Sequence, residues 1–209
     1  MGGKAELDVA VGIRGILFDM DGVVVRQQLD FLAIKQEIFG DTHGYILERM
    51  AVLSPPDRLR AESILERHET AAALSAEPMD GILPFLAWME ATDLRRGLVT
   101  RNSRKSVDLV LGRLGIGFDA VVTREDAPPK PAPEPVWTAC RGMGLRPSEV
   151  MFVGDFEFDM LSGRRAGAQT VLLRSGTMTA SEHADLSVGS LAELRSWLET
   201  WNGVGRPHQ

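Results

Sequence analysis

Two carboxylates stand one residue apart at the end of a short apolar run. Residues 15–18 are apolar, and they are followed by Asp19, Met20, Asp21 and Gly22. The run predicts a buried strand, and the carboxyl ends of strands in an open parallel sheet are where ligands bind. Neighbouring carboxylates repel, so the pair indicates a bound cation or a shared proton. The alternative is a solvated Asp-Gly turn, because such turns are common.

Other polar residues stand at similar positions further along the chain. Thr100 ends an apolar strand, and Asp155 ends another, with Asp159 four residues later. Lys130 stands alone in a proline-rich loop, and prolines stiffen a loop. Each of these signals is weak alone, since Lys130 fits an ordinary solvated loop and Asp159 fits an acid at the start of a helix.

The order Asp-x-Asp-Gly, Thr, Lys and Gly-Asp-x-x-x-Asp resembles the haloacid dehalogenase-like superfamily. The resemblance extends over residues 13–173, and the four motifs together are highly specific. It implies an aspartate-based phosphatase with a parallel α/β core.

Alternating strands and helices independently predict the same fold class. After a first strand at residues 14–18, strands are expected at 96–100, 118–122, 149–153, 169–173 and 186–188. Helices are expected at 84–91, 103–114, 134–143, 156–166 and 190–201. This alternation predicts an α/β fold, a Rossmann-like parallel sheet with helices on both faces.

Between the first strand and the second, the sequence changes character. Apolar residues recur at helical spacing from residue 26 to residue 79, without a convincing strand. This segment resembles the helical cap that many members of the superfamily carry there. We therefore expect a core domain of residues 1–25 and 80–209 and a small all-helical cap of residues 26–79, built from three or four short helices, and a loose tail over residues 1–12.

Composition limits the kind of partner. The 209 residues are 44% hydrophobic and carry a formal net charge of −6, which disfavours nucleic acid and anionic membranes. No apolar run is long enough to span a membrane, the N-terminus lacks an apolar signal core, and Cys140 is the single cysteine. We expect a cytoplasmic monomer or weak homodimer that acts on a small-molecule phosphomonoester.

The resemblance assigns a role to each polar residue. Asp19 is the nucleophile that forms an aspartyl-phosphate. Mg²⁺ lies between the Asp19 carboxylate, the Asp21 backbone carbonyl and the Asp155 carboxylate, and Asp159 supports the metal or Lys130. We expect the phosphoryl group to be bound by side chains and loop N–H groups of Met20, Asp21, Gly22, Thr100, Arg101, Asn102 and Lys130.

The expected catalytic residues are Asp19, Asp21, Thr100 and Lys130, and the expected metal site comprises Asp19, Asp21, Asp155 and Asp159. Asp21 determines the reaction class, since a carboxylic acid with a raised pKa can protonate a leaving group and then activate water. Dehalogenase members of the superfamily lack this second aspartate.

Three alternatives remain open: a phosphomutase, a haloacid dehalogenase on the same fold, or a non-catalytic, receiver-like phosphate-binding regulator. A receiver is typically shorter and has no helical insert after its first strand. The chain departs from the family pattern at Val23, Arg26 and Phe156, which leaves the physiological substrate open.

Overall fold

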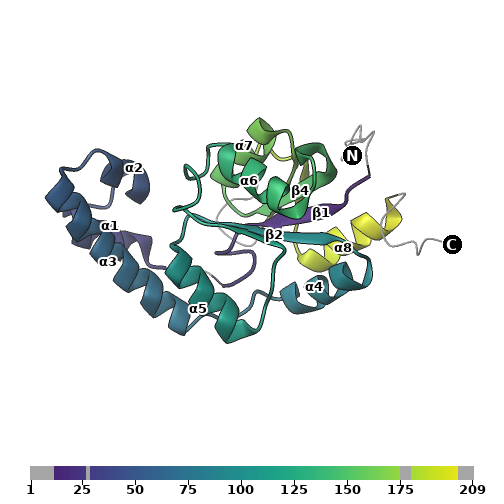
Figure 1. Ribbon diagram of the computed structural model, residues 1–209, viewed down its shortest axis with the longest axis horizontal. Coiled ribbons are helices and arrows are strands. Elements are labelled where there is room, and N and C mark those ends of the chain that lie inside the picture. Colours follow the sequence, from purple (N-terminus) through teal and green to yellow (C-terminus); the bar gives the residue numbers. More distant parts are fainter. Residues whose placement is uncertain (1–11, 27–28, 175–179, 202–209) are drawn as a thin grey trace.

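A single parallel sheet forms the centre of the computed structural model, which describes residues 12–26, 29–174 and 180–201 (Figure 1). Within these ranges the sheet has six strands in the order β3-β2-β1-β4-β5-β6. The strands are β1 (Gly15–Phe18), β2 (Arg95–Val99), β3 (Ala120–Val122), β4 (Val150–Gly154), β5 (Gln169–Leu173) and β6 (Leu186–Val188). The predicted fold class is confirmed, with β1 near the middle of the sheet.

Strand β1 is buried along its whole length, which explains why it is continuously apolar. Phe18 is in register with Leu98 of β2 and with Val153 of β4. The three strands are parallel, so the chain leaves each of them at the same edge of the sheet. This edge therefore receives the polar residues that follow β1, β2 and β4 in the sequence.

The sheet lies between two helical layers (Figure 1). Side chains along each strand alternate between its two faces. Ile16 and Phe18 belong to the apolar cluster that includes residues of α4 (Ile82–Ala91), α5 (Arg104–Leu114) and α8 (Leu191–Thr200). Leu17 belongs to the cluster on the other face, with α6 (Glu134–Met143). Helix α7 (Glu157–Ala166) packs on β4 and β5, and the short 3-10 helix η1 (Pro147–Glu149) precedes β4. Both faces of the sheet are thus covered.

The segment between β1 and α4, which we define as the insert, spans residues 26–79, and its described residues form three helices. They are α1 (Phe31–Phe39), α2 (Ile46–Ala51) and α3 (Pro55–Leu74). Their own apolar cluster contains Leu29, Ile34, Ile46, Met50, Ala61 and Leu65. The prediction of short helices is wrong for α3, which has 20 residues, because it begins with the Ser54 cap and two prolines and then continues through helix-forming residues.

The insert contacts the core through α3. This helix runs from α1 and α2 to α5, and Ala73 near its end belongs to the main core cluster (Figure 1). The two connecting segments lie side by side, since the Met79 N–H donates to the Val24 carbonyl at 2.9 Å and the Arg26 N–H donates to the Glu77 carbonyl at 3.0 Å. The division into two domains at residues 26 and 80 stays a prediction.

Among the described residues, no helix is both long and apolar enough to cross a membrane. Residues 1–11, which contain most of the expected N-terminal tail, lie outside the described residues.

Candidate active site

The carboxyl ends of three adjacent strands bring Asp19, Thr100 and Asp155 to one edge of the sheet. Asp19 follows β1 directly, and its N–H donates to the Val153 carbonyl of β4 at 2.9 Å. The Thr100 N–H donates to the Val122 carbonyl of β3 at 3.0 Å. Ladder-like backbone bonds therefore fix the main chain at these positions beyond the ends of the strands.

Lys130 lies at the centre of this group. Its Nζ donates to Asp19 Oδ1 at 2.6 Å, to Asp159 Oδ1 at 2.6 Å and to the Val99 carbonyl at 3.1 Å. The residue is 2% exposed. These three acceptors match the three protons of an ammonium group, so Lys130 is held in place rather than solvated.

The charge on Lys130 is stabilised by its neighbours. Burial alone would lower the pKa of the ammonium group, but the carboxylates of Asp159 and Asp19 outweigh it and raise that pKa. Burial also raises the pKa of the Asp159 carboxyl, to about 6, although Lys130 acts in the opposite direction. One cation is thus shared between the partly buried Asp19 and the buried Asp159.

Asp155 adds a third acid to the cluster. One carboxylate oxygen each from Asp19, Asp155 and Asp159 lie within 4.8 Å of one another. Burial and, next, the charge of Asp19 raise the pKa of the Asp155 carboxyl to about 8. The cluster thus contains three carboxyl groups and one lysine, so the charge of Lys130 does not balance three ionised carboxylates.

Gly22 makes room for the Asp155 carboxylate. The backbone at Gly22 has a φ of +78°, and a Cβ atom there would lie 2.0 Å from Asp155 Oδ2. Any side chain at residue 22 would therefore displace the acid, and a positive φ disfavours other residues in addition. A glycine after Asp21 is therefore required both by the close approach of the Asp155 carboxylate and by the positive φ of the turn.

This set of donors fits a hard divalent cation, because it offers closely spaced carboxylate oxygens with uncompensated charge. Asp19 and Asp155 contribute side chains to it. Asp159 is already engaged, since its Oδ1 accepts from Lys130 and its Oδ2 accepts the Phe156 N–H at 3.1 Å. The geometry thus favours Asp159 as the residue that holds Lys130.

Asp21 occupies a separate part of the site. Its Oδ2 accepts from Asn102 Nδ2 at 2.5 Å, and the Asn102 N–H donates to Thr100 Oγ1 at 3.1 Å. Burial and, next, the charge of Asp19 raise the pKa of the Asp21 carboxyl to about 7, although the bond from Asn102 opposes the shift. A carboxyl group in this range exchanges a proton near neutral pH.

The loop between Asp19 and Val25 folds back on itself. The Met20 carbonyl accepts the N–H groups of Val24 and Val25, both at 2.9 Å, and the Gly22 N–H donates to the Val25 carbonyl at 2.8 Å. The Met20 side chain is buried. The expected contribution of the loop N–H groups to anion binding stays a prediction.

Arg101 has protein partners. Its Nη1 donates to the Lys130 carbonyl at 2.6 Å, and its Nη2 contacts both carboxylate oxygens of Glu48, in α2, at 2.9 and 2.7 Å. The guanidinium also lies 4.9 Å from the centre of the Phe158 ring. In this arrangement Arg101 joins the insert to the core, and its expected contact with a substrate anion stays a prediction.

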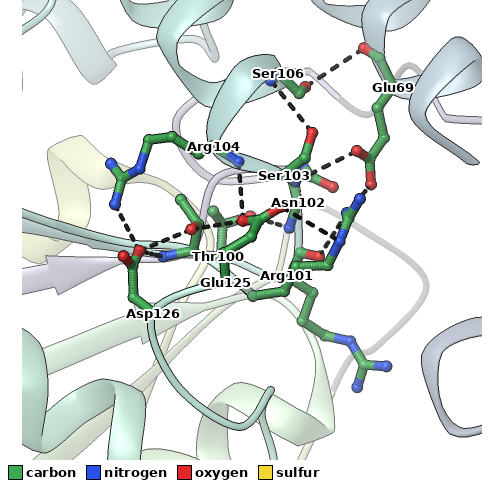
Figure 2. Close-up of polar contacts among 11 residues, drawn as sticks. Glu69, Thr100, Arg101, Asn102, Ser103, Arg104, Ser106, Glu125 and Asp126 are labelled. Atoms are coloured by element: carbon green, nitrogen blue, oxygen red, sulfur yellow. Dashed lines mark hydrogen bonds and ion pairs between the residues drawn. The ribbon is translucent and has the colours of Figure 1, made fainter. Parts of the chain in front are cut away.

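A buried acid and a partly buried arginine near Asn102 were not predicted from the sequence. Glu69 of α3 forms an ion pair with Arg124 and accepts the Ser103 N–H at 3.3 Å (Figure 2). A signal for Glu69 was present, because it continues an i, i+4 series of buried residues on α3, namely Ala61, Leu65 and Ala73. A carboxylate in an apolar helical stripe indicates a buried partner.

A family model for haloacid dehalogenase-like hydrolases matches residues 35–173. A haloacid dehalogenase-like hydrolase domain-containing protein from Arabidopsis thaliana is 30% identical over 208 residues, covering 90% of this chain and 84% of the relative. The chain belongs to the haloacid dehalogenase-like hydrolases. The family predicted from the four motifs is confirmed, although the matched range begins after Asp19.

Two further similarities agree with this assignment. An N-acetylmuramic acid 6-phosphate phosphatase from Pseudomonas aeruginosa is 30% identical over 191 residues, covering 78% of this chain and 83% of the relative. A hydrolase from Pseudomonas syringae has a TM-score of 0.78 at 18% identity, covering 91% of this chain and all of that structure (100%), which shows the shared fold. The chain is thus a hydrolase of the phosphatase type.

Proposed function

We propose that the chain is a Mg²⁺-dependent phosphatase that hydrolyses a small phosphomonoester through an aspartyl-phosphate on Asp19. The observation that carries the proposal is the Asp19 carboxylate at the end of β1, held by Lys130 at 2.6 Å and grouped with Asp155. The substrate class is supported by a relative whose name specifies a sugar 6-phosphate.

In the first half-reaction, a carboxylate oxygen of Asp19 attacks phosphorus and the ester P–O bond breaks. The leaving oxygen takes a proton from Asp21 Oδ1, because Oδ2 is engaged by Asn102. Thr100 Oγ1 accepts the Asn102 N–H, which leaves the hydroxyl proton for a phosphoryl oxygen. Lys130 provides a fixed positive charge beside the nucleophile, and phosphoryl transfer depends mostly on such positioning and charge stabilisation.

In the second half-reaction, water attacks phosphorus and the acyl-phosphate P–O bond breaks. Asp21, now a carboxylate, takes the proton from this water and returns to its initial state. Asp19 is released as a carboxylate together with inorganic phosphate. A single acid with a pKa near 7 is suited to both steps, because it must give and then accept a proton at the same pH.

Mg²⁺ would be held by the carboxylates of Asp19 and Asp155 with the Asp21 backbone carbonyl. When bound, it supplies a Lewis acid that offsets the negative charge of the phosphoryl group. Asp159 acts on the site through Lys130. The cluster of raised carboxyl pKa values at Asp155 and Asp159 supports a requirement for added positive charge.

We also propose a reducing, cytoplasmic environment and a monomer or weak homodimer. Cys140 is buried, and burial raises the pKa of its thiol to about 11, which supports a structural thiol without a redox role.

Turnover of p-nitrophenyl phosphate with Mg²⁺, compared with dechlorination of a chloro-acid, tests the proposal. We expect phosphate release only, with a loss of several orders of magnitude in Asp19→Asn. The matched control is Asp108→Asn, on the exposed side of α5, which should be unaffected. Near-wild-type turnover by pure Asp19→Asn protein, or dechlorination, would overturn the proposal. If phosphate release is confirmed, a panel of phosphoesters identifies the preferred substrate.

A further inference from the structure

Glu69 is a charged residue in a buried position of the insert. It lies in α3 and is 2% exposed, and its carboxylate forms an ion pair with Arg124, whose side chain is 17% exposed. A charge removed from water is costly unless it is paired and hydrogen-bonded. The contacts of this pair therefore indicate what the two charges hold in place.

Both members of the pair bind backbone next to Asn102. Glu69 Oε2 accepts the Ser103 N–H at 3.3 Å (Figure 2). Arg124 Nη1 donates to the Arg101 carbonyl at 3.3 Å, and the Arg124 N–H donates to the Asn102 carbonyl at 3.3 Å. The main chain is thus held on each side of Asn102 and at Asn102 itself.

A second contact fixes α3 against the same segment. The Ser106 hydroxyl donates to the Glu69 backbone carbonyl at 3.4 Å, and Ser103 caps α5 by accepting the Ser106 N–H at 3.3 Å (Figure 2). Glu69 therefore joins α3 to the start of α5 by both its side chain and its main chain.

The held residue contacts the proposed acid–base group. Asn102 is 6% exposed, and its Nδ2 donates to Asp21 Oδ2 at 2.5 Å. A small cavity beside this bond is lined by Asp21, Asn102 and Glu69, together with apolar residues that include Ala72 and Val110. Glu69, Asn102 and Asp21 thus border one small space, and the Asn102 amide is held there by its bond to Asp21 and by the anchored backbone.

We propose that Glu69, with Arg124, is a positioning residue for the acid–base step. It holds Asn102 so that the amide fixes Asp21 Oδ2 and leaves Oδ1 directed at the leaving-group oxygen. The insert thereby contributes to the chemistry through α3, at a distance from the phosphoryl group. This inference rests on the proposed function of Asp21.

Loss of this alignment affects leaving groups unequally. As the ester P–O bond breaks, an alkyl oxide must take a proton from Asp21 Oδ1, whereas an aryl oxide leaves with little help. A displacement of about 1 Å in a catalytic group can lower the rate by about 10²-fold. The ratio of kcat/KM on aryl phosphate to kcat/KM on alkyl phosphate reports the first half-reaction and therefore the position of Asp21.

The experiment measures kcat and KM of Glu69→Gln for p-nitrophenyl phosphate and for ethyl phosphate. We expect kcat/KM, which reports the first half-reaction alone, to fall by about 10-fold to 10²-fold for the alkyl ester and to stay within about threefold for the aryl ester. The matched control is Glu66→Gln, one turn earlier on α3, whose carboxylate pairs with Lys105 of α5 at 2.6 Å on the exposed surface. This control should leave the ratio unchanged.

Two further variants complete the test. Asn102→Ala should raise the aryl-to-alkyl ratio by itself, and adding Glu69→Gln to it should raise the ratio no further. If Glu69→Gln does not unfold cooperatively, Arg124→Lys takes its place in both comparisons. An equal loss of kcat/KM on both esters, or no loss on either, would overturn the positioning role, whereas activity in Asp19→Asn would overturn the proposed function instead.

Discussion

Two of the ion pairs that join the insert to the core, Glu69–Arg124 and Glu48–Arg101, have the same chemistry in different surroundings. We call Glu69–Arg124 the base contact, since it lies where α3 meets α5, and Glu48–Arg101 the tip contact, since it lies on α2. The side chains of the base contact are 2% and 17% exposed, and those of the tip contact are 42% and 22% exposed. Both connect an insert carboxylate to an arginine within reach of the site.

The difference in exposure predicts different behaviour. Breaking a buried pair leaves an uncompensated charge in the interior, whereas an exposed pair contributes little and weakens in salt. Around the tip contact, the ring of Tyr45, which directly precedes α2, lies 4.6 Å from the ring of Phe158 at a tilted angle, and the Phe158 ring also faces Arg101. We therefore expect local opening of the insert to be easier at its tip than at its base.

The largest expected effect is on stability. Arg124→Met leaves the buried Glu69 carboxylate without its ion-pair partner and should lower the free energy of unfolding by about 3–5 kcal/mol. Glu48→Gln, at the tip, should lower it by about 1 kcal/mol or less. Urea unfolding of the two variants measures both values, and equal losses would contradict the distinction between base and tip.

Hydrogen exchange compares the local stability of α2, at the tip, with that of α3, at the base. Amides of α2 should exchange faster than amides in the middle of α3, because local opening of the tip requires only exposed contacts to break. High salt or Glu48→Gln should speed exchange in α2 by several-fold and leave the α3 amides near Glu69 unchanged. Mass-spectrometric exchange of peptides from the two helices measures this, and faster exchange around Glu69 would argue against an anchored base.

The smallest expected effect concerns a pair within the insert. The hydrogen bonds from Arg49 and the His43 N–H lower the pKa of Asp41 to about 2. A carboxyl group whose pKa is lower in the folded state than in the unfolded state stabilises the protein at pH values above the unfolded-state pKa. This stabilisation is lost as the pH falls through the folded-state pKa. The wild-type advantage over Asp41→Asn in urea midpoint should therefore shrink between about pH 4 and pH 2. An advantage that grows as the pH falls would contradict this assignment.

Some features of the fold and the site follow from the sequence, and the base and tip contacts do not. Strands β5 and β6 occur at the predicted bounds, because short apolar runs between turns specify strands locally. The aspartates and Lys130 converge as expected, since parallel strands end at one edge of the sheet. These features follow from local pattern and topology.

The two ion pairs do not follow from local pattern. Glu69 and Arg124 are 55 residues apart, and Arg101 and Glu48 are 53 residues apart. No spacing rule joins such residues, so Arg101 was expected at the substrate and Glu48 was not singled out. The length of α3 was also underestimated, because a helix that packs against both the insert and α5 lacks a single apolar face.

The most direct test of the account is a search for phosphorylated Asp19 in the Asp21→Asn variant. With p-nitrophenyl phosphate, transfer to Asp19 should proceed, since an aryl oxide hardly needs a proton, while hydrolysis should lose the ~10²–10⁴-fold contribution of the general base. Rapid-quench kinetics should then show a burst of p-nitrophenol, and peptide mass spectrometry should place one phosphoryl group on Asp19. A variant that turns over without a burst, or whose phosphoryl group lies on another residue, would contradict the account.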